Sequence, residues 1–87
     1  MNANTIYENF IKIMKDEIND GILPSHLDEN LLQKDTHLNQ LGLDSISLVG
    51  LLARLSDMTD NYYPDTMFSG DPTLWEIAER ASEGYNS

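Results

Sequence analysis

The chain of 87 residues contains no cysteine. This absence excludes disulfide bonds, thiolate metal sites and any thioester or nucleophile built on a protein thiol. Basic residues are also scarce, with 5 Lys and Arg against 15 Asp and Glu, and the formal net charge is −10. Because nucleic-acid binders need a basic surface, this balance argues against DNA or RNA and favours basic protein surfaces as partners.

Long apolar runs are missing too, so we expect no membrane span. The N-terminus has no basic region followed by an apolar stretch, and we therefore expect no secretory signal and a cytoplasmic location. The length suits one small domain, predicted over residues 1–87 with an ordered core at about 5–82. The composition permits a dimer but does not predict one, and we expect a monomer.

Apolar residues recur at helical spacing in three segments, without strand alternation, and predict an all-α fold. The first helix is expected to start at the capping-box pattern Thr5-Ile6-Tyr7-Glu8 and to stop at Asn19-Asp20-Gly21. The second is expected to begin after Asp44, which can cap it, and to end near Thr59–Asn61. The third starts at a second capping-box pattern, Thr73-Leu74-Trp75-Glu76, and ends at Gly84.

Two connections separate these helices. From residue 22 to residue 43 the helical period is lost, which predicts a long loop with a helical turn around Glu29–Gln33. Pro64 and Gly70 bracket a short segment, Asp65–Ser69, long enough for about one helical turn. The apolar residues expected to build the core or to pin the long loop are Ile6, Phe10, Ile13, Met14, Leu27, Leu31, Leu32, Leu38, Leu41, Leu43, Leu48, Leu51, Leu52, Leu55, Met58, Leu74, Ile77, Ala78 and Ala81.

The stretch Leu41-Gly42-Leu43-Asp44-Ser45-Ile46 places a serine directly after an acidic residue, where a glycine-containing loop meets an apolar-periodic run. Helix N-termini favour phosphate, so a serine at this position is well placed for modification. The simplest alternative is structural, because serine is a good N-cap and Asp-Ser pairs often open helices for that reason alone.

Two motifs in order make a resemblance specific. Residues 36–47, Thr-His-Leu-Asn-Gln-Leu-Gly-Leu-Asp-Ser-Ile-Ser, resemble the prosthetic-group attachment region of acyl and peptidyl carrier proteins. Residues 67–78, in which Phe68 precedes Pro72-Thr73 and a final helix, resemble the closing segment of that family. The resemblance extends from about Ile6 to Ala81, at fitting spacing.

This resemblance implies a four-helix carrier-protein bundle of three main helices and one short helix, with a long loop between the first two. It implies that Ser45 is esterified with 4′-phosphopantetheine, taken from coenzyme A by a separate transferase. Asp44 would then position the serine and, in the transferase complex, lie near the Mg²⁺ of the transferase. Gly42 permits the tight turn that presents the hydroxyl, with Leu43 between them in the same motif. The missing cysteines agree, because any thioester must then hang from a cofactor thiol.

The resemblance also implies that partner enzymes grip the second helix beside the attachment site. By helical spacing, the outer face of this helix carries Ile46, Ser47, Gly50, Ala53, Arg54 and Asp57. This face is small and mildly apolar, whereas the corresponding face of housekeeping fatty-acid carriers is strongly acidic. We therefore expect a specialised pathway, of the polyketide, nonribosomal-peptide or antibiotic type, with Ile46 as an exposed apolar anchor.

The predicted function is a free-standing carrier of acyl or aminoacyl groups that catalyses nothing itself. Its expected partners are a phosphopantetheinyl transferase, an acyl- or aminoacyl-loading ligase or adenylation enzyme, and downstream synthases, transferases or tailoring enzymes. Three alternatives stay open: an unmodified docking module of the same fold, a fatty-acid carrier, and a carrier of amino acids rather than acyl chains. No metal site is expected, because His26 and His37 stand alone in the long loop.

Overall fold

The computed structural model describes residues 2–23 and 29–83. This part contains three α-helices, namely α1 (Ala3–Asn19), α2 (Ser45–Thr59) and α3 (Leu74–Ser82). Three short 3₁₀ helices accompany them: η1 (Glu29–Leu31), η2 (Leu38–Leu41) and η3 (Asp65–Phe68). The described ranges hold no strand and no helix long and apolar enough to cross a membrane, and the mostly helical structure agrees with the predicted all-α class.

The N-terminal helix begins two residues earlier than expected. Asn2 is its N-cap, and the Asn2 side chain accepts a hydrogen bond of 2.8 Å from the backbone N–H of Thr5. The prediction of a capping box that starts at Thr5 is therefore wrong. Asparagine caps a helix as well as threonine does, and it stands three residues upstream, so Thr5 lies inside the first turn.

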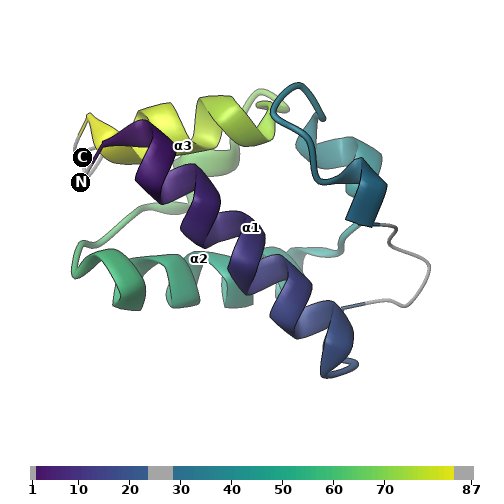
Figure 1. Ribbon diagram of the computed structural model, residues 1–87. Coiled ribbons are helices and arrows are strands. Elements are labelled where there is room, and N and C mark those ends of the chain that lie inside the picture. The colour runs from purple at the N-terminus through teal and green to yellow at the C-terminus, as the bar shows by residue number, and fades with distance from the viewer. Residues whose placement is uncertain (1, 24–28, 84–87) are drawn as a thin grey trace.

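Helix α1 is the centre of the packing, because it contacts both α3 and α2 (Figure 1). Its predicted stripe of Ile6, Phe10, Ile13 and Met14 is fully covered. A continuous core forms where this stripe meets the inner faces of the other two helices. The buried apolar residues outside α1 are Leu23, Leu32, Leu38, Leu41, Leu51, Leu52, Leu55, Tyr63, Met67, Leu74, Ile77, Ala78 and Ala81.

Two of the apolar residues predicted to be covered, one leucine and one methionine, are exposed, and three other predictions concern residues that are not described. Leu31 is 36% exposed and Met58 is 38% exposed, so neither belongs to the core. Each of them lies at the end of its helix, where fewer neighbouring elements are left to cover a side chain. The predictions for Leu27, His26 and Gly84 lie outside the described residues.

A polar pair joins α1 to α2 inside this otherwise apolar packing. The Glu17 carboxylate, near the end of α1, lies 3.5 Å from the Arg54 guanidinium of α2. The Glu17 side chain is 6% exposed and the Arg54 side chain 43% exposed. Burial of a carboxylate is unfavourable unless a cation or hydrogen-bond donors meet it, so Arg54 serves the interior of the molecule as well as its surface.

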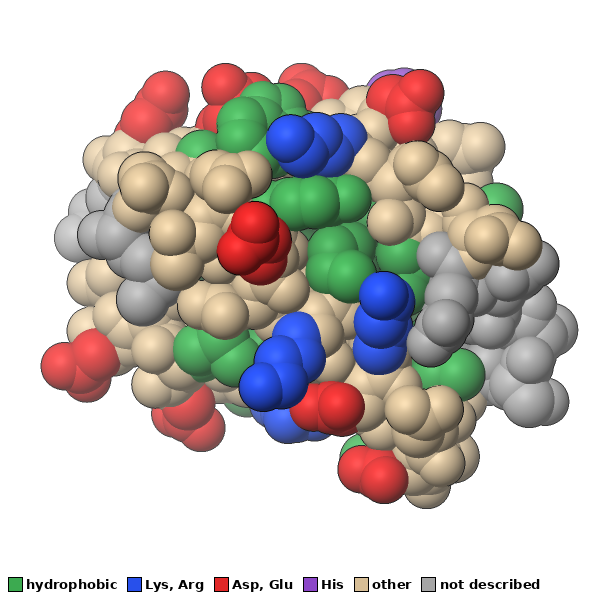
Figure 2. All heavy atoms as spheres, in the orientation of Figure 1, with side chains coloured by type: hydrophobic (Ala, Val, Ile, Leu, Met, Phe, Trp, Pro, Cys, Tyr) green, Lys and Arg blue, Asp and Glu red, His purple; other side chains and the backbone are tan. Residues whose placement is uncertain are grey.

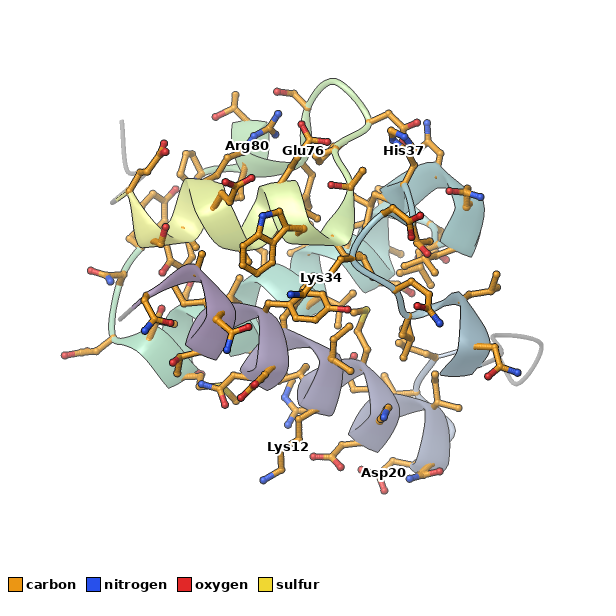
Figure 3. All side chains as sticks on the ribbon, turned by 45° about the horizontal axis from the view of Figure 1, so that its top comes forward. Lys12, Asp20, Lys34, His37, Glu76 and Arg80 are labelled. Atoms are coloured by element: carbon orange, nitrogen blue, oxygen red, sulfur yellow. The ribbon has the colours of Figure 1, made fainter. Side chains whose placement is uncertain are left out.

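The segment before α2 is tied to the start of α3 by backbone hydrogen bonds. Trp75 N–H donates to Lys34 O at 3.1 Å, and Leu74 N–H donates to Thr36 O at 2.9 Å. Figure 3 shows the Lys34 side chain between α1 and α3. Its ammonium lies 4.5 Å from the ring centre of Trp75 and 5.6 Å from that of Tyr7, within cation–π range of both.

The charges are unevenly spread over the surface. In Figure 2, Lys and Arg side chains gather over the face that α1 crosses, while most Asp and Glu side chains in view lie toward its edge. The excess of acidic residues is therefore concentrated away from the centre of the α1 face. Helix α2 itself carries one basic residue, Arg54.

Candidate functional site

The turn that leads into α2 is built by η2 and one glycine. Leu38 and Leu41 of η2 are 4% and 1% exposed, so the core fixes this short helix in place. Gly42 ends it with φ 65° and ψ 29°, a left-handed conformation that is cheap for glycine, and Gly42 N–H donates to Asn39 O at 3.2 Å. The chain is thereby redirected so that the residues after Gly42 enter the new helix.

Asp44 caps α2, as expected from the sequence. Its carboxylate accepts a hydrogen bond of 2.8 Å from the backbone N–H of Ser47. This bond, together with the hydrogen bond from the Ser47 side chain, lowers the pKa of the Asp44 carboxyl below its ordinary value of 3.8. Asp44 is thus ionised at neutral pH and lies at the positive end of the helix dipole.

Ser45 is the first residue of α2 and is exposed. Because Asp44 is the cap, the structural alternative in which Ser45 itself caps the helix does not hold. The Ser45 hydroxyl is instead free to face solvent at the N-terminus of a helix of 15 residues. A phosphodiester at this position would lie beside the first-turn N–H groups, where the helix dipole favours negative charge.

A tie between two loops holds the entry to α2 in register with α3. The backbone N–H of Asn39 donates to the Asp71 carboxylate at 2.9 Å, and Leu38 N–H donates to Pro72 O at 2.9 Å. His37 Nδ1 donates to the Asp71 carbonyl at 2.8 Å. Figure 3 shows His37 at this junction, near Glu76 at the start of α3. His37, expected to be a lone surface histidine, is exposed but takes part in this tie.

An apolar groove opens beside Ser45. Leu48, Val49 and Leu52 of α2 line it together with Phe68 of η3. A second stretch of groove shares Val49 and Leu52 and continues to the far end of α2. The residues that line this second stretch are Val49, Leu52, Ala53, Ser56, Asp57, Tyr62 and Tyr63.

Sequence reasoning missed this groove. Val49 is apolar but lies off the buried face of α2, and it is 58% exposed. The available signal was that the apolar residues of α2 cover a wider arc than the core needs. Val49 was assigned neither to the core nor to the outer face of α2. Phe68, by contrast, belongs to a separate element, so its position beside Ser45 follows only from the folded chain.

The outer face predicted for α2 is mostly exposed. Ile46 is 82% exposed, and Gly50, Ala53 and Asp57 are exposed as well. Ser47 is half-buried. Arg54 differs from the others, because it is paired with Glu17 of α1. Within residues 2–23 and 29–83, no group of three or more histidine or acidic side chains could hold a metal ion.

Comparison with protein families gives one finding. Residues 22–81, well over half of the chain, match the family model described as the phosphopantetheine attachment site. The matched range contains η2, Gly42, Ser45, the whole of α2 and all but the last residue of α3. No match was found among curated proteins or among solved structures.

Proposed function

The chain belongs to the phosphopantetheine-attachment family, and we propose that Ser45 is the serine that carries its prosthetic group. The domain is a carrier domain, not a catalytic one, and its cofactor is 4′-phosphopantetheine bound covalently to a serine. The observation that supports Ser45 is its exposure at the N-terminus of α2, directly after the turn at Gly42 and the cap at Asp44. We further propose that residues 1–87 act as one carrier domain.

The attachment is a phosphoryl transfer. The Ser45 oxygen forms a bond to the β-phosphorus of coenzyme A, the bond from that phosphorus to the 3′,5′-ADP leaving group breaks, and the hydroxyl proton passes to a base of the transferase. The bound group supplies a thiol, which a chain without cysteine cannot supply itself. Tethering one substrate in this way raises its local concentration at each active site that the arm can reach.

Three neighbours support the serine in this proposal. Gly42 sets the direction of the chain through its left-handed conformation, and Leu43, half-buried, anchors the residue between the turn and the cap. Asp44 keeps a negative charge next to Ser45 at neutral pH because its pKa is lowered by the Ser47 hydrogen bonds. A carboxylate with that charge is suited to contact the Mg²⁺ of the transferase.

The outer face of α2, called the partner face below, supports the proposal of a specialised pathway. Among its residues only Asp57 is acidic, while Ile46, Gly50 and Ala53 present a small apolar surface. Arg54 contributes less to this face than the sequence suggested, because its guanidinium is drawn to Glu17. We propose that the partners are a transferase, a loading ligase and synthases of polyketide or nonribosomal-peptide type, and that they read this surface by shape more than by charge.

Intact-mass measurement tests the attachment. The purified protein is incubated with coenzyme A, Mg²⁺ and a broad-specificity phosphopantetheinyl transferase, and we expect a gain of one phosphopantetheine. Ser45→Ala should abolish the gain, and Ser47→Ala, two residues further on, should retain it. A wild-type protein that gains no mass would instead favour an unmodified docking module.

Transferase kinetics test the partner face. Ile46→Glu should lower kcat/KM, because it places a charge where an apolar contact is proposed. Asn61 is also exposed but lies past the end of α2, so Asn61→Glu is a control that adds the same charge away from the proposed contact. An unchanged kcat/KM for Ile46→Glu would remove Ile46 from the interface.

A further inference from the structure

The groove beside Ser45 continues along most of α2. Its floor and walls on α2 are residues that share one helical face, because their spacings of three, four, seven and eleven from Ser45 return to nearly the same direction. Phe68 closes one side near the serine, and Tyr62 and Tyr63 lie at the other end. The α2 residues of this face are Ser45, Leu48, Val49, Leu52 and Ser56.

The length of the groove matches the length of the arm. Ser45 and Ser56 are eleven residues apart on α2, which corresponds to roughly 17 Å at the rise of an α-helix. The 4′-phosphopantetheine arm has fourteen bonds between the serine oxygen and the thiol sulfur. At the roughly 3.5 Å that an extended chain spans for every three bonds, this arm is about 16 Å long, close to the length of the groove. An arm laid in the groove therefore brings its thiol level with Ser56.

The far end of the groove differs chemically from the rest. Asp57 is the charged side chain among the lining residues, and it is exposed. Tyr62 lines the same end of the groove and is 72% exposed. Within the described residues, the two ion pairs do not involve Asp57. Arg54 pairs with Glu17, and His37 pairs with Asp71. A carboxylate next to an open aromatic face is suited to an ammonium group, through charge attraction and cation–π contact.

We infer that the phosphopantetheine arm lies in this groove and that Asp57 and Tyr62 favour an aminoacyl cargo with a free α-ammonium group. The inference rests on the proposed attachment at Ser45. In an aminoacyl thioester the ammonium is two bonds from the carbonyl carbon, so it falls beside Asp57 when the thiol is level with Ser56. A simple acyl cargo has no positive charge there and gains nothing from the carboxylate.

Nuclear magnetic resonance of loaded protein tests the inference. Ser45 is loaded with phosphopantetheine analogues in which a stable amide replaces the thioester, carrying either an alanyl or a propionyl group. These two cargoes differ by the ammonium alone. We expect the arm to shift the backbone amide signals of Val49, Leu52 and Ser56 relative to the unmodified protein. The alanyl cargo should add shifts at Asp57 and Tyr62 that the propionyl cargo does not cause.

Two variants give the comparison a matched control. Asp57→Asn should abolish the difference between the alanyl and propionyl spectra, because the carboxylate is removed with little change of shape. Asp60→Asn removes a neighbouring acid that does not line the groove, and it should retain the difference. Identical spectra for the two cargoes, or shifts confined to the residues next to Ser45, would overturn the inference. A failure to load any analogue would instead count against attachment at Ser45, so the two failures are distinguishable.

Discussion

Glu17 of α1 and Arg54 of α2 form an ion pair with 3.5 Å between carboxylate and guanidinium, and the carboxylate is almost fully covered. Arg54→Ala leaves this carboxylate without its cation. We expect the free energy of unfolding in urea to fall by about 1 to 3 kcal/mol. Glu17→Gln, which removes the buried charge, should cost less than Arg54→Ala. Full stability of Arg54→Ala would show that the pair contributes nothing and return Arg54 to the partner face alone.

The contact of Lys34 with Trp75 predicts a stability effect of a different origin. Lys34→Met keeps the aliphatic stem but removes the ammonium 4.5 Å from the indole ring centre. We expect a loss of about 0.5 to 1 kcal/mol and a changed Trp75 fluorescence emission. Lys12 is exposed on α1, so Lys12→Met is a charge-matched control that should leave both properties unchanged. Equal effects of the two variants would assign the change to net charge.

The caps of α1 and α3 predict that one threonine contributes to stability and another does not. The Thr73 hydroxyl accepts a hydrogen bond from the Glu76 N–H at 3.1 Å, and the Glu76 carboxylate accepts one from the Thr73 N–H at 3.0 Å. Thr73→Ala should therefore cost about 1 kcal/mol of stability. Thr5 is exposed and does not cap α1, so Thr5→Ala should change stability by less than about 0.5 kcal/mol. Thermal unfolding followed by circular dichroism measures both. A larger loss for Thr5→Ala would move the start of α1 back to Thr5.

Gly50 predicts a gain of stability. It lies inside α2, and a Cβ added there would meet nothing within 4 Å. Gly50→Ala should therefore stabilise the protein by about 0.5 to 1 kcal/mol in urea unfolding. The same variant should lower transferase kcat/KM if a partner approaches the backbone closely at Gly50. A stabilised variant with unchanged kinetics would exclude a close approach at this residue.

The two helix-capping carboxylates predict acid lability. Hydrogen bonds from Ser47 lower the pKa of Asp44, and hydrogen bonds from Thr73 lower that of Glu76, below their ordinary values of 3.8 and 4.5. The unfolded chain thus binds more protons, and this contribution to stability is present above the ordinary values and lost as pH falls through the lowered ones. Unfolding measured between about pH 5.5 and pH 3 should show a decline that Asp44→Asn and Glu76→Gln reduce. If both variants show the same decline as the wild-type protein, Asp44 and Glu76 are not the source of the acid lability.

Features of the fold that depend on neighbours in sequence were predictable. The bounds of α2, the cap at Asp44 and the capping box of Thr73 and Glu76 follow from residues within one helical turn of each other. The burial of the α1 stripe follows from its period alone. The start of α1 was misplaced because Asn2 and Thr5 are both acceptable caps, and the sequence does not state which one the chain uses.

Features that join distant segments were not predictable in the same way. The period of α1 marks Ile6 to Met14 as core, but it does not reveal that Glu17 is covered, because this depends on Arg54 across the bundle. The turn at Gly42 and the start of α2 at Ser45 are local and were predictable, whereas the groove needs Phe68 and Tyr62 from elements beyond α2. The placement of Lys34 over Trp75 likewise depends on two segments that only folding brings together.

The main-chain hydrogen bonds that join residues 34–38 to the start of α3 affect how the sequence can change during evolution. These bonds join main-chain groups of Lys34, Thr36, Leu38, Pro72, Leu74 and Trp75. Because no side chain takes part in these bonds, the choice of residue along the segment is limited by packing instead, as at the buried Leu38 and Leu74. Exposed side chains along this segment can therefore change while the main-chain bonds continue to hold the entry to α2 against α3.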